Sequence, residues 1–108
     1  MAPCGLLVTP ERLAALKDAG VAACSFSIDG PDAASHDAFR GVSGAFDNVM
    51  RAMRAAREVG MPFQMNTTVS TLNVDRLEEL HALAVAQGAA KLDLFFLNYF
   101  ILLLLYLI

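Results

Sequence analysis

A helix, a glycine and a strand follow one another three times along this chain of 108 residues. Each predicted helix ends at a glycine, Gly20, Gly60 or Gly88. The first helix also has a clear start, where Thr9 suits the N-cap and Pro10 the first helical position, and the third helix is expected to open at Asn73. The expected strands follow the glycines, at residues 21–28, 62–69 and 91–97. Strands that alternate with helices in this way form right-handed crossovers, so the sequence predicts an α/β fold with a parallel sheet.

Polar side chains occupy one face of each predicted strand, whereas a parallel sheet covered on both faces is apolar throughout. Alternate residues of a strand share a face, and the polar set is Ser25, Ser27, Asp29, Gln64, Asn66, Thr68, Ser70, Lys91 and Asp93. A buried polar group without a partner costs roughly 1–3 kcal/mol. We therefore expect this face to be wet or covered by a polar ligand, as in a barrel or partial barrel around a site.

Composition excludes several classes of protein. The chain is 56% hydrophobic and 18% charged, which is typical of a globular domain. The net charge is −3 and the basic residues form no stripe, which argues against a nucleic-acid partner. Cys4 and Cys24 show no C-x-x-C spacing, and the start of the chain has no secretion signal, so we expect no disulfide framework and a cytoplasmic protein.

The C-terminal run is apolar from Leu94 to Ile108 except at Asn98. It is shorter than the roughly 20 residues that span a bilayer. We expect a domain over residues 1–97 and an apolar tail over 98–108 that is a non-native or unstructured extension. A membrane-interface anchor and an additional core element are the alternatives for the tail.

The densest motif, Ser27 to Pro31, lies at the carboxyl end of the first predicted strand, where parallel α/β folds bind their ligands. Ser27 and Asp29 lie on one side of the strand and together suit an ammonium, a hydroxyl or a ribose. The alternative is a plain turn, in which Asp29 makes an Asx bond and Gly30 supplies positive φ.

Two further segments carry candidate ligand-binding groups. His36 to Gly41 falls in a connection too long for an ordinary βα loop. There Arg40 suits a carboxylate, and His36 is either a general acid or a solvated or helix-capping residue. The helix that opens at Ser43 and Gly44 offers its N-terminus to an anion. In the second strand, Asn66 and Thr68 suit ribose hydroxyls or an amino-acid head group. Ordinary strand propensity explains the neighbouring Thr67 and Val69 but not Asn66.

The motifs Ser-x-Asp-Gly-Pro (27–31), His-Asp-x-x-Arg-Gly (36–41) and Asn-Thr-Thr-Val (66–69) follow one another in an order that resembles radical S-adenosylmethionine (SAM) enzymes. The resemblance is greatest to the SPASM-type branch, which includes haem-tailoring and peptide-modifying members. It implies a partial (β/α)6 TIM-like barrel, of which this chain supplies three βα units.

The resemblance also implies a function. In these enzymes a [4Fe–4S] cluster, held by a C-x-x-x-C-x-x-C loop, reduces SAM to a 5′-deoxyadenosyl radical that abstracts hydrogen from a substrate. Ser27 and Asp29 match positions near the methionyl and ribose groups of SAM, and Arg40 matches a partner for its carboxylate. Asn66 and Thr68 match positions near the ribose and adenine. The resemblance assigns no catalytic residue or metal ligand here, and the substrate would be a haem precursor or a peptide.

The chain departs from the family at the cluster. The three-cysteine loop is missing, and Cys4 and Cys24 cannot replace it, so we expect an internal fragment that is inactive alone. Two other functions remain open at this point. One is a small α/β interaction module that docks through its apolar tail, and the other is a different barrel enzyme that uses Asp29 and His36 as base and acid.

Overall fold

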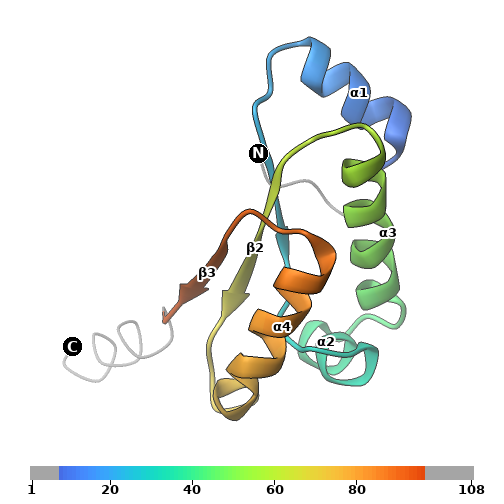
Figure 1. Cartoon of the computed structure of the whole chain (residues 1–108). Coiled ribbons are helices and arrows are strands. Elements are labelled where there is room, and N and C mark those ends of the chain that lie inside the picture. Colours follow the sequence, from blue (N-terminus) through green and yellow to red (C-terminus); the bar gives the residue numbers. More distant parts are fainter. Residues whose placement is uncertain (1–7, 97–108) are drawn as a thin grey trace, which may run out of the picture.

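The computed structural model describes residues 8–96 of the chain. Its elements, in chain order, are α1 (Pro10–Asp18), β1 (Cys24–Ser27), α2 (Ala33–Arg40), α3 (Ala45–Glu58), β2 (Phe63–Thr68), the 3-10 helix η2 (Val74–Arg76), α4 (Leu77–Gln87) and β3 (Leu92–Phe95). The strands form a parallel sheet in the order β1-β2-β3 (Figure 1). The predicted α/β fold with three parallel strands is confirmed.

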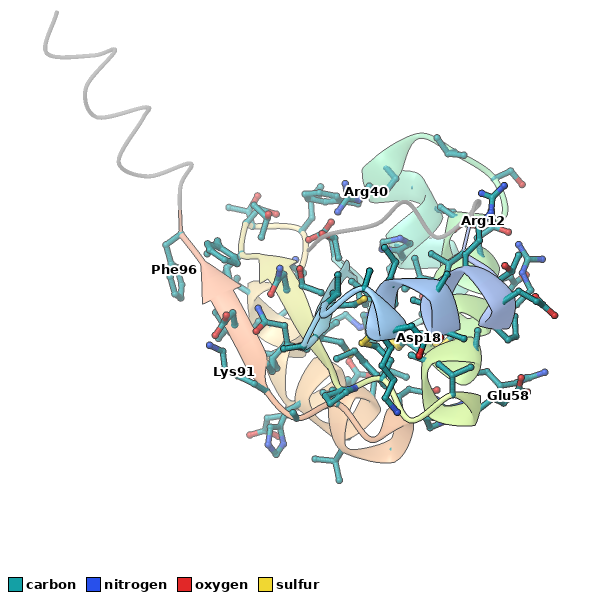
Figure 2. All side chains as sticks on the ribbon, turned by 90° about the horizontal axis from the view of Figure 1, so that it is seen from above. Arg12, Asp18, Arg40, Glu58, Lys91 and Phe96 are labelled. Atoms are coloured by element: carbon teal, nitrogen blue, oxygen red, sulfur yellow. The ribbon has the colours of Figure 1, made fainter. Side chains whose placement is uncertain are left out.

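The strand register aligns polar residues across the sheet. Ser27 pairs with Asn66, and Asn66 pairs with Asp93, so these three residues form one row over β1, β2 and β3. The carboxyl ends of β1 and β2 meet at one edge of the sheet, where α2 and the segment that leads into α4 also lie (Figure 1). Lys91 and Phe96 flank the outer strand β3 (Figure 2).

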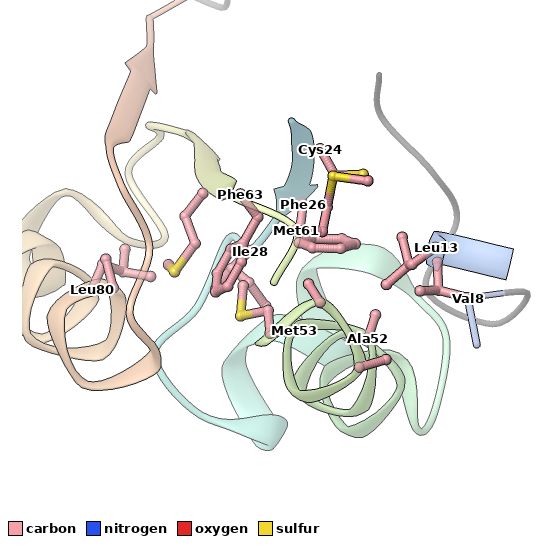
Figure 3. Close-up of a cluster of buried hydrophobic side chains, with 14 residues drawn as sticks. Val8, Leu13, Cys24, Phe26, Ile28, Ala52, Met53, Met61, Phe63 and Leu80 are labelled. Atoms are coloured by element: carbon pink, nitrogen blue, oxygen red, sulfur yellow. The ribbon is translucent and has the colours of Figure 1, made fainter. Parts of the chain in front are cut away.

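One face of the sheet is buried beneath the helices. Phe26 and Met65 are at most 1% exposed and belong to a core cluster with Met53 of α3 and Leu80 of α4 (Figure 3). On the opposite face Ser27 is exposed, and Asn66 and Thr68 are half-buried. The two faces therefore separate apolar from polar side chains as the alternation predicts.

Helix α2 is a correction to the expected loop over residues 36–41. Asp32 caps the helix, because its Oδ1 accepts the Ser35 N–H at 2.9 Å, and Gly41 ends it with φ of 69°. The hydrogen bonds from Ser35, reinforced by Arg76, lower the pKa of Asp32 to about 2. The cap and the terminal glycine are both readable in the sequence, but this helix has only 8 residues.

The third predicted helix also begins differently. Asn73 precedes the short helix η2, and α4 starts only at Leu77. The Asn73 side chain makes no helix cap; it is 1% exposed and turns toward the ends of the strands. The first helix, by contrast, starts as expected, since Thr9 Oγ1 accepts the Arg12 N–H at 3.2 Å.

Two sequence predictions fall wholly or partly outside the described residues. The predicted tail, residues 98–108, lies outside them, as does Cys4, so the proposed domain boundary at residue 97 stays a prediction. Within residues 8–96, the helices are too short or too polar to cross a bilayer.

Position 30 needs glycine because a larger side chain would not fit there. Its φ is not positive, unlike the φ of other glycines in the described chain. A Cβ atom on Gly30 would collide with Ser35 Oγ and would lie 2.5 Å from His36 N and 2.8 Å from Ser35 C. The start of α2 therefore packs directly on the backbone that follows β1. This corrects the turn interpretation, in which Gly30 supplied positive φ.

We predict that Gly30→Ala lowers the free energy of unfolding by about 1–3 kcal/mol, because backbone atoms of α2 must move to admit the methyl group. Urea unfolding followed by circular dichroism measures the change. Ser35→Ala should not rescue the variant, because two of the three close atoms belong to the backbone. Full rescue by Ser35→Ala would show that only the serine hydroxyl obstructs.

Candidate functional site

The polar face of the sheet holds a connected group of side chains. Gln64 Nε2 donates to Asn66 Oδ1 at 2.8 Å and to Asp93 Oδ2 at 3.0 Å. Lys91 Nζ lies 3.3 Å from the same Asp93 oxygen. Ser27 lies in the same row as Asn66 and Asp93, and Thr68 lies two residues further along β2. This face thus presents hydroxyl, amide and carboxylate groups from all three strands.

Asp29 lies just beyond the end of β1 and is 2% exposed, unlike the other polar residues of its parity. Its Oδ1 accepts the Thr68 N–H at 2.8 Å. Its Oδ2 is buried without a hydrogen-bond donor in the described chain, and Arg40 Nη2 lies 2.7 Å away as an ion-pair partner. The carboxylate is thus engaged within the protein, between β2 and α2.

The Asp29 carboxylate extends the pairing of β1 with β2 by one more bond. Ile28 N–H donates to Asn66 O at 2.9 Å, so a continued parallel ladder would next join Thr68 N–H to Ile28 O. Instead Asp29 Oδ1 accepts the Thr68 N–H, and the Thr67 hydroxyl donates to Ile28 O at 2.6 Å. Side chains therefore replace the backbone at the point where the ladder ends.

Two more buried side chains hold the backbone of Asp29. The Asp29 N–H donates to His36 Nδ1 at 3.0 Å, which leaves the proton of a neutral imidazole on Nε2. Asn73 Nδ2 donates to Asp29 O and to Thr68 O, both at 2.9 Å, and Asn73 Oδ1 accepts the Ser70 N–H at 2.9 Å. His36 and Asn73 are each 1% exposed.

Arg40 connects this buried group to solvent. It is the last residue of α2 (Figure 2), and its side chain is 41% exposed. Its guanidinium pairs with the buried Asp29 carboxylate. A guanidinium carries five donors, so one that is anchored at a single nitrogen retains others for a planar anion. Arg40 is therefore the cationic group best placed to receive a carboxylate at this edge of the sheet.

The anion site expected at Ser43 and Gly44 is occupied by the protein itself. Asp37 Oδ2 accepts the Gly44 N–H at 2.9 Å, and Oδ1 accepts the Phe46 N–H at 2.8 Å. The Phe46 hydrogen bond is the main reason why the pKa of Asp37 lies below its usual value. The start of α3 is thus capped by a carboxylate from α2, which satisfies the amides that an anion would need.

The five predicted ligand-binding residues gather at one edge but divide into two layers. Ser27, Asn66 and Thr68 lie on the accessible face, whereas Asp29 lies beneath it and Arg40 reaches from α2 to solvent. The acid and base alternative for Asp29 and His36 does not suit this geometry, because both are buried and His36 Nδ1 is bonded to the Asp29 amide.

Sequence reasoning missed the roles of Thr67 and Asn73. Thr67 reads as an ordinary strand residue and Asn73 as a helix cap. The signal available in the sequence is that each lies close to the end of the second strand, where backbone groups leave the ladder and need other partners.

Metal ligands do not gather in the described part of the chain: residues 8–96 contain no group of three His, Cys, Asp or Glu side chains able to hold a metal ion. Cys24 is 2% exposed and lies on the helix-covered face of β1, away from the polar side. Burial raises the pKa of its thiol, which disfavours the thiolate that a metal needs.

We predict that stability falls as the pH is lowered through about 6.5, the ordinary histidine value. Burial lowers the pKa of His36, so the unfolded chain binds a proton that the folded chain resists. The stabilisation is complete above the unfolded pKa and declines below it, by at most about 1.4 kcal/mol per pH unit. Urea unfolding between about pH 7.5 and 5.5 tests this, because carboxylates titrate lower.

The matched control for this prediction is His36→Asn, whose Oδ1 can accept the Asp29 N–H but does not titrate. In this variant, the free energy of unfolding should lose its slope against pH between about pH 7.5 and 5.5. An unchanged slope would assign the pH dependence to another group.

The radical SAM superfamily profile matches residues 1–84 of the chain. The chain is 48% identical over 97 residues to an AdoMet-dependent heme synthase of Nitratidesulfovibrio vulgaris, covering 90% of this chain and 26% of that protein. It is 31% identical over 96 residues to a PqqA peptide cyclase of Methylocella silvestris, covering 89% of this chain and 26% of that protein.

A mycofactocin maturase of Mycolicibacterium smegmatis is 36% identical over 86 residues, covering 79% of this chain and 22% of that protein. The chain thus spans about a quarter of the length of these curated relatives. The matched profile covers most of the chain, and the parallel βα units agree with the TIM-like barrel of the superfamily. The chain belongs to the radical SAM superfamily, and the relatives it matches are SPASM-type enzymes.

Proposed function

We propose that this chain is the part of a radical SAM enzyme that holds the amino-acid and ribose portions of SAM. Arg40 receives the SAM carboxylate, and Ser27 accepts a hydrogen bond from its ammonium group. Asn66 and Thr68 bind the ribose hydroxyls and the edge of the adenine. Asp29 acts on the ligand through Arg40, because its carboxylate is buried behind the guanidinium.

The observation that carries the proposal is the shared polar face. Ser27 and Asn66 are aligned in register on neighbouring strands, Thr68 follows on the same face, and Arg40 reaches the same edge from α2. SAM has a carboxylate, an ammonium, a sulfonium and a ribose, and these polar groups complement the side chains on this face.

The iron–sulfur cluster does not fit the described residues. Clusters of this kind are held by cysteine thiolates, and the chain has two cysteines, of which Cys24 is buried on the apolar side. In this superfamily the cluster supplies the electron that cleaves SAM. We therefore assign the cluster ligands to another part of the enzyme and limit the role of this chain to binding and orienting SAM.

We also propose a haem precursor, in preference to a peptide, as the substrate of the whole enzyme. The chain is 48% and 43% identical to two AdoMet-dependent heme synthases, but 31% identical to the peptide cyclase. The polar sheet face would then serve SAM alone, and the substrate would contact other residues. A cytoplasmic location agrees with a buried cysteine outside any disulfide in the described chain.

Binding of SAM fragments to the chain tests the proposal. Isothermal titration should show saturable binding of SAM, and Arg40→Ala should weaken SAM and methionine by about 10–100-fold, because a charge-assisted hydrogen bond contributes about 1.5–3 kcal/mol. Adenosine, which has no carboxylate, should bind Arg40→Ala as it binds the wild type. Asn66→Ala should instead weaken the binding of SAM and adenosine and leave methionine binding unchanged.

The matched control is Arg54→Ala, which removes the same charge from an exposed position on α3. It should leave all three ligands unaffected. Equal losses of affinity in Arg40→Ala and Arg54→Ala would show that the effect comes from net charge alone. Failure of the wild type to bind SAM would refute the proposed function.

We predict that the chain alone forms no 5′-deoxyadenosine, because two cysteines cannot supply the cluster ligands. The test is anaerobic reconstitution with iron and sulfide, followed by dithionite, SAM and chromatographic detection of the nucleoside. Product above a control without protein would contradict this prediction.

A further inference from the structure

The buried polar side chains of the described residues converge on one place. Asp29, His36, Thr67 and Asn73 are the polar or charged residues that the structure buries within residues 8–96, with exposures of 0–2%. All four meet where β1 and β2 end. The remaining buried side chains are apolar, so the concentration of polar groups at this edge has a local cause.

Three of these residues bind consecutive backbone groups in the segment directly after β1. Thr67 Oγ1 donates to Ile28 O at 2.6 Å, His36 Nδ1 accepts the Asp29 N–H at 3.0 Å, and Asn73 Nδ2 donates to Asp29 O at 2.9 Å. We call His36, Thr67 and Asn73 the strand-end clamp. It fixes both ends of the peptide unit between Ile28 and Asp29, and the carbonyl that follows.

A clamp on this peptide fixes the direction of the Asp29 side chain. With Asp29 N–H and C=O both held, its carboxylate reaches Thr68 N at 2.8 Å and Arg40 Nη2 at 2.7 Å. Asn73 also donates to Thr68 O at 2.9 Å, so it holds β1 and β2 together from the same amide group. The buried Asp29 thus lies between the clamp and Arg40, the residue that faces solvent.

Stability explains part of this arrangement, because the backbone groups that leave the ladder at the strand ends need hydrogen-bond partners. The clamp also holds a charged pair at the edge of the polar face, with Arg40 41% exposed. A guanidinium with a fixed orientation binds a planar anion with less loss of conformational entropy.

We propose that His36, Thr67 and Asn73 are positioning residues that fix the Asp29 carboxylate, which in turn aims Arg40 at the carboxylate of an α-amino-acid ligand. The proposal deepens the SAM-binding function and rests on it for the identity of the ligand. The clamp acts only on the carboxylate end, and the adenosine end is bound without it.

The test compares Asn73→Asp, Thr67→Val and Ala84→Gly in the full 108-residue chain. Asn73→Asp keeps an acceptor for the Ser70 N–H but cannot make the two donations, and Thr67→Val removes one hydroxyl at nearly constant volume. Ala84→Gly is the control, because it weakens α4 without touching the clamp. Titrations use methionine and adenosine at temperatures where each variant is folded.

We expect Asn73→Asp to weaken methionine binding about tenfold and to leave adenosine binding within twofold. Thr67→Val should weaken methionine binding by a smaller factor and also leave adenosine binding within twofold, and Ala84→Gly should change neither. If Asn73→Asp does not fold, Thr67→Val decides. Wild-type methionine affinity in a folded clamp variant, or equal losses for methionine and adenosine, would overturn the proposal.

A ligand-free measurement separates this proposal from the proposed function. In 15N NMR spectra the Thr68 amide and the Arg40 side-chain NεH should shift in Asn73→Asp and stay in place in Ala84→Gly. If the wild type binds neither SAM nor methionine, the proposed function fails. The Thr68 amide and Arg40 NεH signals then remain as the test of the clamp. Unshifted signals would refute the clamp even where SAM binds.

Discussion

The buried carboxylate of Asp29 is the interaction on which the site depends. One oxygen accepts the Thr68 N–H at 2.8 Å and the other pairs with Arg40 at 2.7 Å, so a single side chain joins β1, β2 and α2. A charge buried at 2% exposure requires this compensation, because an unpaired ion in a low-dielectric interior is strongly unfavourable. The loop after β1 therefore has little conformational freedom, and Gly30 allows α2 to pack against it without space for a side chain.

The sheet converts this local arrangement into a surface. Because successive residues alternate between faces, the same strands bury Phe26 and Met65 beneath the helices and present Ser27 and Asn66 on the other side. Parallel pairing brings the strand ends to one edge, and the register places Ser27, Asn66 and Asp93 in a row. Polar groups far apart in sequence thus become neighbours through backbone geometry alone.

The three-stranded sheet of the described residues has two open edges. In the described part, β1 and β3 each pair on one side only, and Leu94, Phe95 and Phe96 remain 38–54% exposed beside the outer strand. The relatives are about three and a half times as long, and in a TIM-like barrel both edges of such a sheet carry further strands. The residues of the strand-end clamp and the Asp29 carboxylate, by contrast, all lie within the described residues. Under the proposed function, SAM is oriented by this segment and the cluster is held by another part of the enzyme.

The sequence by itself determined the order of helices and strands, their parallel pairing and the separation of polar from apolar faces, because glycine stops, capping residues and two-residue alternation act locally. It also pointed to Ser27, Asp29, Arg40, Asn66 and Thr68, through the resemblance to a known family. Only the tertiary structure decided that residues 33–40 form a helix, that Asp29 lies beneath the polar face and that Thr67 and Asn73 hold the backbone of Ile28 and Asp29. The last two features depend on contacts between residues that are up to 44 positions apart. A periodic pattern within one segment does not predict such contacts, because burial and hydrogen-bond partners are determined only when segments pack together.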